Sequence, residues 1–432
     1  MLDNVLNRVV GAPKLQSGSA CSLFTDLKNS RFGRSSQHHS FKIQYCMKSL
    51  TSSAPASETS KSHAEKAVAN AAFLVDEAGL ELAAEHWQSA NVIGLDTEFV
   101  REKTFRARPG LVQISNASQI WLADAVAMPH MPTLAGLLSD TSKTKVLHSV
   151  GEDLEVLQQL TGALPEPLFD TQIAAAMLGL PLQYRHESLV EEIFSVHLPG
   201  GKARNDWCRR PLAPALLEYA AQDVIWLPAL HDHLSEQLDH QNRLAWLEED
   251  CRRIVEDTRR GIAPPALSRI KGAGRLPDEV LTILEALADW REAQAIERDL
   301  PRRFVLSDEA LIELASSALK SGAAQAVSTL KPGMRHRHGD RLVELIETCD
   351  ATDFQRPAWL NALDSDQRER LKQVQHAVRE LAEELNVDPA LIASKKELTR
   401  VIRGEQPEWL NGWRGVVLEE RLKAASVNIS PS

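Results

Sequence analysis

The first half of the chain alternates short apolar runs with helical patterns, whereas its second half is helical throughout. Between about residues 85 and 240, four apolar runs have the length and composition of buried strands: 92–95, 111–114, 120–122 and 145–147. The first of these follow one another after short turns, which predicts antiparallel pairing in that part. The pattern indicates an α/β domain with a mixed sheet.

After residue 245 the strand signals end and amphipathic helices follow. Residues 279–294 place their apolar side chains on one stripe, which is typical of a helix packed on a core. The next segment, 298–311, is echoed more weakly at 387–398, and Ser307 fits an N-cap. Both segments come after one long helix and before another, so the echo predicts an all-helical unit present twice.

Acidic side chains accompany the strand signals. Asp96 and Glu98 follow the apolar run 92–95 and are two residues apart, so they point to one face of a strand. Two carboxylates in an apolar setting repel each other and are costly to desolvate, and a bound divalent cation such as Mg²⁺ resolves this. The pair therefore points to metal chemistry. The alternative is that Asp96 caps the strand and Glu98 lies in solvent.

Three further side chains complete the candidate site. Asp153 is predicted in the first turn of a helix that follows the strand 145–147, whereas Tyr219 and Asp223 are four residues apart on one helix face. Alone, Asp153 fits a favourable interaction with the helix dipole, and Tyr219 fits a half-buried aromatic residue. The order and spacing of the whole set favour a common site over separate packing roles.

These residues resemble the motifs of the ribonuclease D family, in the DEDD superfamily of 3′-to-5′ exonucleases with a tyrosine in the third motif. The first motif is similar to residues 95–101, followed by a strand at 109–114. The second is similar to 148–154, and the third with its lead-in to 206–224. As a set the matches are highly specific, and they imply a ribonuclease H-like fold.

The resemblance also implies a mechanism. Asp96, Glu98 and Asp223 would hold one ion, and Asp96 would bridge to a second ion that Asp153 reaches directly or through water. Two ions, Mg²⁺ or Mn²⁺, would stabilise the attacking and leaving oxygens, and one would lower the pKa of its water. Tyr219 would orient that water, and the product would be a 5′-nucleoside monophosphate from the 3′ end of RNA.

Residues beside the motifs are candidate substrate contacts. Phe99 is placed to stack on a terminal base, with core packing as the equal alternative, and Thr97 lies between the metal carboxylates. Arg101 belongs to a basic loop that suits phosphates, with a solvated loop as the alternative. His148 is expected beside the substrate or in a structural role. Lys202 stands in for a family lysine, although the local spacing is shorter than in the family.

The repeated helical unit resembles the helicase-and-ribonuclease-D C-terminal (HRDC) module. The predicted organisation is a leader at 1–68, an exonuclease domain at 69–245, a linker at 246–273, an HRDC domain at 274–350 and an HRDC-like domain at 365–428. Basic patches in both modules are candidate nucleic-acid contacts, with solvated helical faces as the alternative. They comprise Lys331, Arg335, Arg337 and Arg341, and then Lys395, Lys396, Arg400 and Arg403.

Composition limits the expected mode of nucleic-acid binding and the expected compartment. A net charge of −10 argues against broad nonspecific affinity for nucleic acids. The serine-rich, acid-poor start fits a disordered leader or a start codon placed too early, with Met47 as the start, and a mitochondrial transit peptide is the alternative. Five cysteines without metal-site spacing indicate a reducing compartment, and no stretch is apolar enough to cross a membrane. We expect a cytoplasmic monomer.

The sequence thus predicts a metal-dependent 3′-to-5′ exoribonuclease with RNA as its partner. Its substrates, the 3′ ends of tRNA precursors and other small structured RNAs, rest on the resemblance alone. A DNA exonuclease of the same superfamily is the enzymatic alternative, because no residue that reads the 2′-hydroxyl is identified. A non-catalytic RNA-binding scaffold is the third hypothesis, and the five intact motif residues argue against it.

Overall fold

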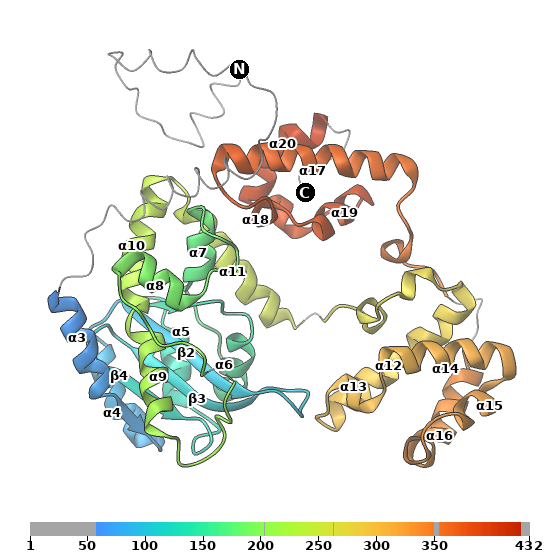
Figure 1. Ribbon diagram of the computed structural model, residues 1–432, viewed down its shortest axis with the longest axis horizontal. Helices are drawn as coiled ribbons and strands as arrows, with labels where there is room; N and C mark the ends of the chain where they lie inside the picture. Colours follow the sequence, from blue (N-terminus) through green and yellow to red (C-terminus); the bar gives the residue numbers. More distant parts are fainter. Residues whose placement is uncertain (1–57, 203, 262, 350–353, 425–432) are drawn as a thin grey trace.

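The computed structural model describes residues 58–202, 204–261, 263–349 and 354–424, which form an α/β domain and two helical units (Figure 1). Most of the predicted leader at 1–68 lies outside the described residues. Its last part differs from the prediction, because Glu58–Ala69 form helix α3. Ala64 and Ala67 of this helix are buried against the core, so the alanine-rich segment belongs to the α/β domain.

A six-stranded mixed sheet lies at the centre of the α/β domain. Its strands are β1 (Ala72–Leu74), β2 (Val92–Val100), β3 (Arg108–Ser115), β4 (Ile120–Asp124), β5 (Thr144–Leu147) and β6 (Leu168–Asp170). Their order is β1-β4-β3-β2-β5-β6. β2, β3 and β4 pair antiparallel, whereas the other neighbours pair parallel. The predicted mixed sheet with an antiparallel part is confirmed.

Strand β2 extends further than the apolar run predicted. Its pairing with β3 continues to Val100, with an irregularity between Glu98 and Phe99, so Asp96 and Glu98 lie within the strand. On the other side, β5 pairs only with residues 92–94 of β2. The acidic part of β2 therefore has a neighbouring strand on one side only, which leaves room for a site beyond the end of β5.

Helices pack around this sheet. They are α4 (Glu77–Trp87), α5 (Pro132–Ser139), α6 (Asp153–Thr161), α7 (Thr171–Met177), α8 (His186–Phe194), α9 (Pro214–Ile225), α10 (Leu227–His240) and α11 (Leu244–Arg260). The predicted linker at 246–273 differs from the structure, since its first part lies in α11. Leu247, Cys251 and Val255 of α11 are buried in the core of the α/β domain. Among the described helices, none has the length and apolar character needed to span a bilayer.

Gly94 allows the junction of α9 and α10 to approach β2 closely. A Cβ atom at this position would lie 2.9 Å from the carbonyl oxygen of Val224 and 2.9 Å from the Cβ atom of Leu227. Both distances are shorter than normal van der Waals contacts, so a larger residue would force the helices away. Val224 follows Asp223, and the close approach therefore sets how near that carboxylate stands to β2.

The first helical unit has an apolar core of its own, formed by residues between 266 and 360. Its helices are α12 (Asp278–Glu297), α13 (Arg302–Val305), α14 (Asp308–Ser321), α15 (Ala323–Ser328) and α16 (Pro332–Glu347). Ser307 accepts a hydrogen bond from the backbone N–H of Ala310 and is the predicted N-cap. The β2–β3 hairpin contacts this unit, because the N–H groups of Phe105 and Arg106 donate to Asp299 at 3.0 and 2.9 Å.

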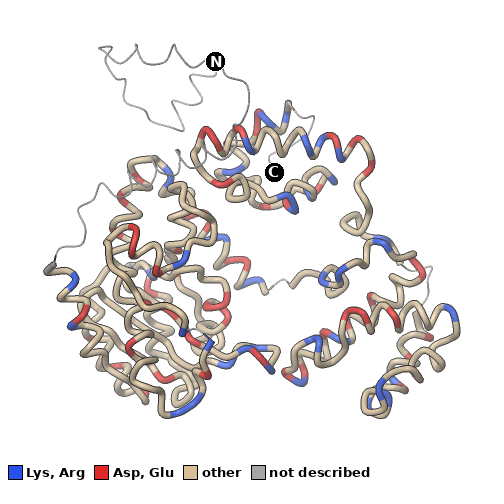
Figure 2. The backbone as a smooth tube through the Cα atoms, viewed as in Figure 1, with Lys and Arg blue, Asp and Glu red and all other residues tan. Residues whose placement is uncertain are grey.

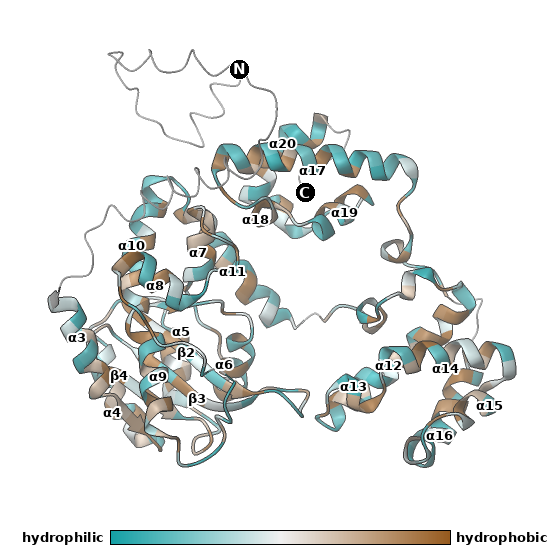
Figure 3. Ribbon diagram, viewed as in Figure 1, coloured by the Kyte–Doolittle hydropathy of each residue, from teal (hydrophilic) through white to brown (hydrophobic). Residues whose placement is uncertain are grey.

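The second helical unit also has a separate apolar core. Its helices are α17 (Ser365–Leu385), α18 (Pro389–Ile392), α19 (Lys395–Ile402) and α20 (Trp413–Ala424). Helix α17 is mainly hydrophilic with short apolar patches (Figure 3), as expected when only one stripe is buried. Two helical units thus follow the sheet domain, and the predicted fold class is confirmed, whereas the domain boundaries stay predictions.

Basic and acidic residues are interspersed on both helical units (Figure 2). Several arginines of the predicted basic patches have partners within the chain. Arg341 pairs with Glu344 at 2.8 Å, and Arg400 pairs with Glu405 at 2.6 Å. These pairings reduce the net positive charge of the patches, and their role in nucleic-acid binding stays a prediction.

We expect Gly94→Ala to lower the free energy of unfolding by about 1–3 kcal/mol, because the added methyl group overpacks the contact with α9 and α10. Urea denaturation followed by circular dichroism would measure the change. Gly136→Ala is the matched control, since a Cβ atom there meets nothing within 4 Å on α5. The control should raise stability by about 0.5–1 kcal/mol. Equal stability of Gly94→Ala and the wild type would contradict the close-approach argument.

Candidate active site

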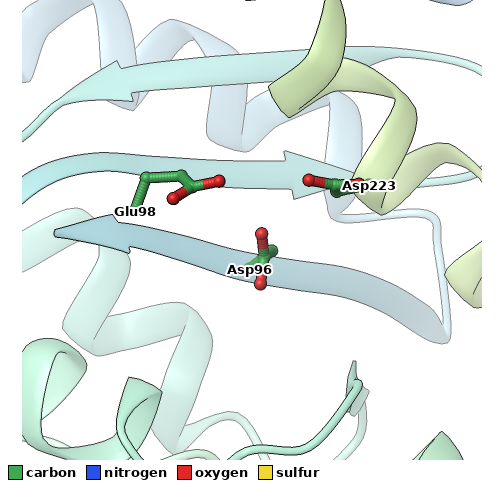
Figure 4. Close-up of side chains that lie close together, drawn as sticks. All are labelled: Asp96, Glu98 and Asp223. Atoms are coloured by element: carbon green, nitrogen blue, oxygen red, sulfur yellow. The ribbon is translucent and has the colours of Figure 1, made fainter. Parts of the chain in front are cut away.

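Three acidic side chains from two elements converge at one point. Asp96 and Glu98 come from β2 and Asp223 from α9, and each offers a carboxylate oxygen within 4.8 Å of the others. Figure 4 shows the carboxyl groups of Glu98 and Asp223 turned toward each other across the position of Asp96. The structure thus brings together three of the four residues that the sequence predicted as metal ligands.

Burial and mutual repulsion raise the pKa values of this cluster. Burial is the largest cause for Asp96, followed by the negative charges of Asp153 and Asp223, and its pKa lies well above the usual range. Burial and the same two neighbours raise the pKa of Glu98 to about 9. Ionising such a group is unfavourable without a compensating positive charge. The cluster therefore favours either protons or a bound cation.

Asp223 is also buried, and its ionised form has one additional stabilising contact. Burial raises its pKa to about 7, although a hydrogen bond with Tyr219 acts in the opposite direction. Burial and the nearby carboxylates raise the pKa of the Tyr219 phenol as well. Tyr219 is buried, and its ring lies 6.2 Å from that of Trp207, centre to centre. The phenol therefore keeps its proton at neutral pH and remains a hydrogen-bond donor.

Asp153 approaches the cluster from α6, where it is the first helical residue. Its carboxylate accepts a buried hydrogen bond of 2.5 Å from the hydroxyl of Thr97. Alternate side chains of β2 point to opposite faces, so Asp96 and Glu98 lie toward α9 while Thr97 lies toward α6. Burial raises the pKa of Asp153 to about 6, despite the bond from Thr97. Asp153 is thus held beside the three-carboxylate cluster and outside it.

The cluster opens into a cleft of about 710 Å³. All five motif residues line it, together with Thr97, Phe99 and His148 from the predicted substrate contacts. Phe99 is partly buried and also packs against the core, so both of its predicted roles fit its position. The donor atoms at the base of the cleft are carboxylate oxygens. This set fits a hard divalent cation better than zinc, which more often takes nitrogen or sulfur ligands.

Two predicted substrate contacts are not among the residues that line the cleft. Arg101 forms ion pairs with Glu152, at 3.1 Å, and with Glu155, so its guanidinium has partners on α6. The ammonium group of Lys202 donates a 2.8 Å hydrogen bond to the carbonyl oxygen of Ala215. Their substrate roles stay predictions, and the arrangement in the structure supports local positioning by both side chains.

His148 holds two neighbouring segments together at the wall of the cleft. Its Nε2 lies 3.0 Å from the carbonyl oxygen of Tyr184, and its Nδ1 lies 2.8 Å from the hydroxyl of Thr171. Burial lowers the pKa of His148, so the ring is neutral at pH 7. Because a carbonyl oxygen only accepts, the proton is on Nε2, and Nδ1 lies beside the Thr171 hydroxyl, which is also 3.2 Å from the carbonyl oxygen of Leu147. These contacts support a structural role for His148 at the cleft wall, and its place beside the substrate stays a prediction.

Four further residues of the cleft wall carry no signal in the sequence analysis. They are Gln172, Arg185, His186 and Glu187. All four come from α7, or from the start of α8 and the residue before it, and these elements were not connected to the motifs by spacing or periodicity. Nothing in the sequence distinguishes Arg185 from other basic residues, and only the fold shows that it lines the cleft.

Known proteins resemble this chain over most of its length. A family model described as 3'-5' exonuclease matches residues 72–239, and an HRDC domain model matches 280–346. Ribonuclease D of Shewanella sp. (strain ANA-3) is 34% identical over 367 residues, which cover 82% of this chain and 94% of that relative. Ribonuclease D of Pseudomonas paraeruginosa is 35% identical over 369 residues, which cover 82% and 96%.

A solved structure shows the same relationship in three dimensions. The crystal structure of Escherichia coli RNase D, described as an exoribonuclease involved in structured RNA processing, matches with a TM-score of 0.75 at 30% identity. The match covers 82% of this chain and 98% of that one. Both the predicted family and the predicted order of a mixed-sheet exonuclease domain and a helical HRDC region are confirmed. The chain belongs to the ribonuclease D family of 3′-to-5′ exoribonucleases.

Proposed function

We propose that this enzyme trims the 3′ ends of tRNA precursors and other small structured RNAs and releases 5′-nucleoside monophosphates. The observation that carries the proposal is the meeting of the three-carboxylate cluster with the Tyr219 hydroxyl in one open cleft. This arrangement supplies both a cation site and, beside it, a hydroxyl whose proton bonds to Asp223 and whose oxygen can accept a hydrogen bond from a water molecule. We expect the working form to be a cytoplasmic monomer.

The four acidic residues of the motifs would hold two divalent ions, Mg²⁺ or Mn²⁺, whose charge stabilises the attacking and leaving oxygens of the phosphodiester. Tyr219 keeps its proton and orients the attacking water through its hydroxyl. Thr97 fixes Asp153 by its hydrogen bond, which favours a positioning role over a direct substrate contact. Phe99 offers an aromatic surface at the cleft wall on which a terminal base can stack.

The choice between RNA and DNA is tested directly with the purified protein. A tRNA with a 3′ extension and a matched single-stranded DNA would each be incubated with Mg²⁺ and then with EDTA. Stepwise shortening of the RNA that stops in EDTA is the expected result. Shortening of the DNA alone would favour the DNA exonuclease, and binding of RNA without cleavage would favour the scaffold.

Asp96→Asn is expected to reduce exonuclease turnover by about 10³-fold or more, because it removes a ligand charge from the centre of the cluster. The same change should raise the melting temperature in EDTA, since it removes a source of repulsion from a buried site. Asp232→Asn is the control, as that carboxylate is exposed on α10. Near-wild-type turnover of Asp96→Asn would contradict the metal assignment.

Stability without metal is expected to fall as the pH rises. The folded protein holds Glu98, Asp223 and Asp153 with pKa values of about 9, 7 and 6, above the value of about 4 in an unfolded chain. Between these values the folded state binds more protons than the unfolded state, so the free energy of unfolding decreases with increasing pH. Added Mg²⁺ should restore stability, and by more at pH 9 than at pH 6.

Thermal unfolding with Mg²⁺ or EDTA across this pH range measures both effects. Glu98→Gln serves as the control, because it should flatten the pH dependence in EDTA by removing the carboxyl group whose pKa is raised furthest among the three. A melting temperature in EDTA that increases steadily from pH 6 to pH 9 would show that these carboxyl groups do not titrate as their burial requires.

Tyr219→Phe should lower kcat by about 10²-fold, because it removes the hydroxyl that orients the water while leaving the ring packed against Trp207. Calorimetric titration with Mn²⁺ is expected to show little change in metal affinity. A large loss of metal affinity with unchanged kcat would instead assign Tyr219 to the support of Asp223.

A further inference from the structure

The cleft has an unusual charge distribution for a site that receives a nucleic acid. Six acidic residues line it: Asp96, Glu98, Glu152, Asp153, Glu187 and Asp223. Arg185 is the one lysine or arginine among the described residues of this lining. An RNA strand adds a negative charge with each nucleotide. Bound cations compensate the charge at the carboxylate cluster, and Arg185 is the fixed positive charge of the cleft wall.

Arg185 is not engaged elsewhere. Its side chain is exposed, and within the described parts of the chain it forms no ion pair or hydrogen bond. The neighbouring acid Glu187 lines the same cleft without pairing with it. In contrast, Arg101 and Arg210 pair with carboxylates. The Arg185 guanidinium is thus available to a ligand.

The start of helix α8 adds backbone donors at the same place. Arg185 is the N-cap residue, and no side chain caps this helix end. The first helical N–H with an intrahelical partner is that of Leu189, which donates to the carbonyl oxygen of Arg185 at 2.9 Å. Uncapped N–H groups and the positive end of the helix dipole favour an anion.

A second observation points independently to a ligand. Both ring nitrogens of His186, the first residue of α8, are buried and have no hydrogen-bond partner. The ring lines the cleft and lies 5.5 Å from that of His148, edge to face. Burial lowers the pKa of His186 to about 3, so the ring is neutral and offers one donor and one acceptor. Buried polar atoms in folded proteins are usually hydrogen-bonded, so the open bonding capacity of His186 is consistent with a partner from outside the chain.

The backbone that carries Arg185 is held in place. The carbonyl oxygen of Tyr184 accepts hydrogen bonds of 3.0 Å from His148 and of 3.0 Å from the amide of Gln172. Both donors belong to elements that also form the cleft wall. The residue directly before Arg185 is therefore fixed relative to the metal cluster, as a preorganised binding site requires.

We infer that Arg185 and the uncapped start of α8 form a phosphate subsite, which holds the RNA backbone phosphate next to the scissile one. Cations held by the carboxylates would neutralise the scissile phosphate itself, which leaves the guanidinium for the neighbouring phosphate. The planar guanidinium of Arg185 matches the two free oxygens of a phosphodiester, and the ring of His186 lines the cleft beside it. This assignment rests on the proposed cleavage of RNA and makes Arg185 a substrate-positioning residue.

The first test is the kinetics of Arg185→Ala on a short single-stranded RNA. The variant should raise KM by about 10- to 100-fold, the range expected for a lost hydrogen bond to a charged group, while kcat changes little. Arg185→Lys should recover part of the loss, because it keeps the charge without the planar guanidinium. Arg252→Ala is the control, since Arg252 is exposed on α11, away from the cleft.

The second test separates phosphate binding from a structural role. RNA affinity would be measured at several salt concentrations in the inactive Asp96→Asn background, with and without Arg185→Ala. Loss of one phosphate contact should reduce the slope of log Kd against log salt by about 0.7. An unchanged KM and an unchanged slope, in a protein whose wild type degrades RNA, would overturn the subsite. A wild type that degrades no RNA would instead overturn the proposed function.

A third measurement identifies the phosphate. Inhibition by 5′-adenosine monophosphate, which carries the phosphate released from the scissile position, should be equal in the wild type and in Arg185→Ala. A loss of inhibitor affinity as large as the loss for RNA would place the contact on the scissile phosphate and overturn the assignment to its neighbour.

Discussion

At Gly94, the α9–α10 junction meets strand β2 with no side chain between them, since a Cβ atom there would lie 2.9 Å from the backbone of Val224. The rest of the site depends on this close approach. Asp96 and Glu98 follow two and four residues later on β2, and Asp223 precedes Val224 on α9. Because β5 pairs only with residues 92–94, the same region that brings α9 close also leaves the acidic part of β2 open to the cleft.

The clustered carboxylates destabilise the folded state in which they are brought together. Burial and mutual repulsion raise the pKa values of Asp96, Glu98 and Asp223, so their ionised forms are unfavourable until a cation is bound. The chain tolerates this because neutral hydrogen bonds hold the surroundings. Thr97 bonds to Asp153, and the amide of Gln113 donates to Asp96 at 3.2 Å. Carboxylates that are held close together despite their repulsion are preorganised to bind a cation. Without a cation, the same arrangement lowers the stability of the folded protein.

The helical units are joined to the exonuclease domain by specific contacts. Arg414 of α20 pairs with Asp250 of α11 in a buried ion pair, with one N–O distance of 2.8 Å. Next to it, the rings of Trp246 and Trp413 stack at 4.5 Å. The first unit instead holds the β2–β3 hairpin, where the guanidinium of Arg302 lies 4.7 Å from the ring centre of Phe105. This hairpin continues the strand that carries Asp96 and Glu98, so the first unit supports one border of the carboxylate cluster.

The sequence alone determined the mixed-sheet class, the helical second half and the five motif residues, because strand and helix periods and the spacing of Asp96, Glu98, Tyr219 and Asp223 are local patterns. It did not determine β1 and β6, since strands of three residues are too short to show a hydrophobic period. It also did not determine that the first part of the predicted linker is helical, because the face that this helix buries is defined only by its packing against the core. Tertiary structure alone decided that Arg185 lines the cleft while Arg101 pairs with α6. Both are basic residues, and what distinguishes them is the set of neighbours that folding brings within bonding distance.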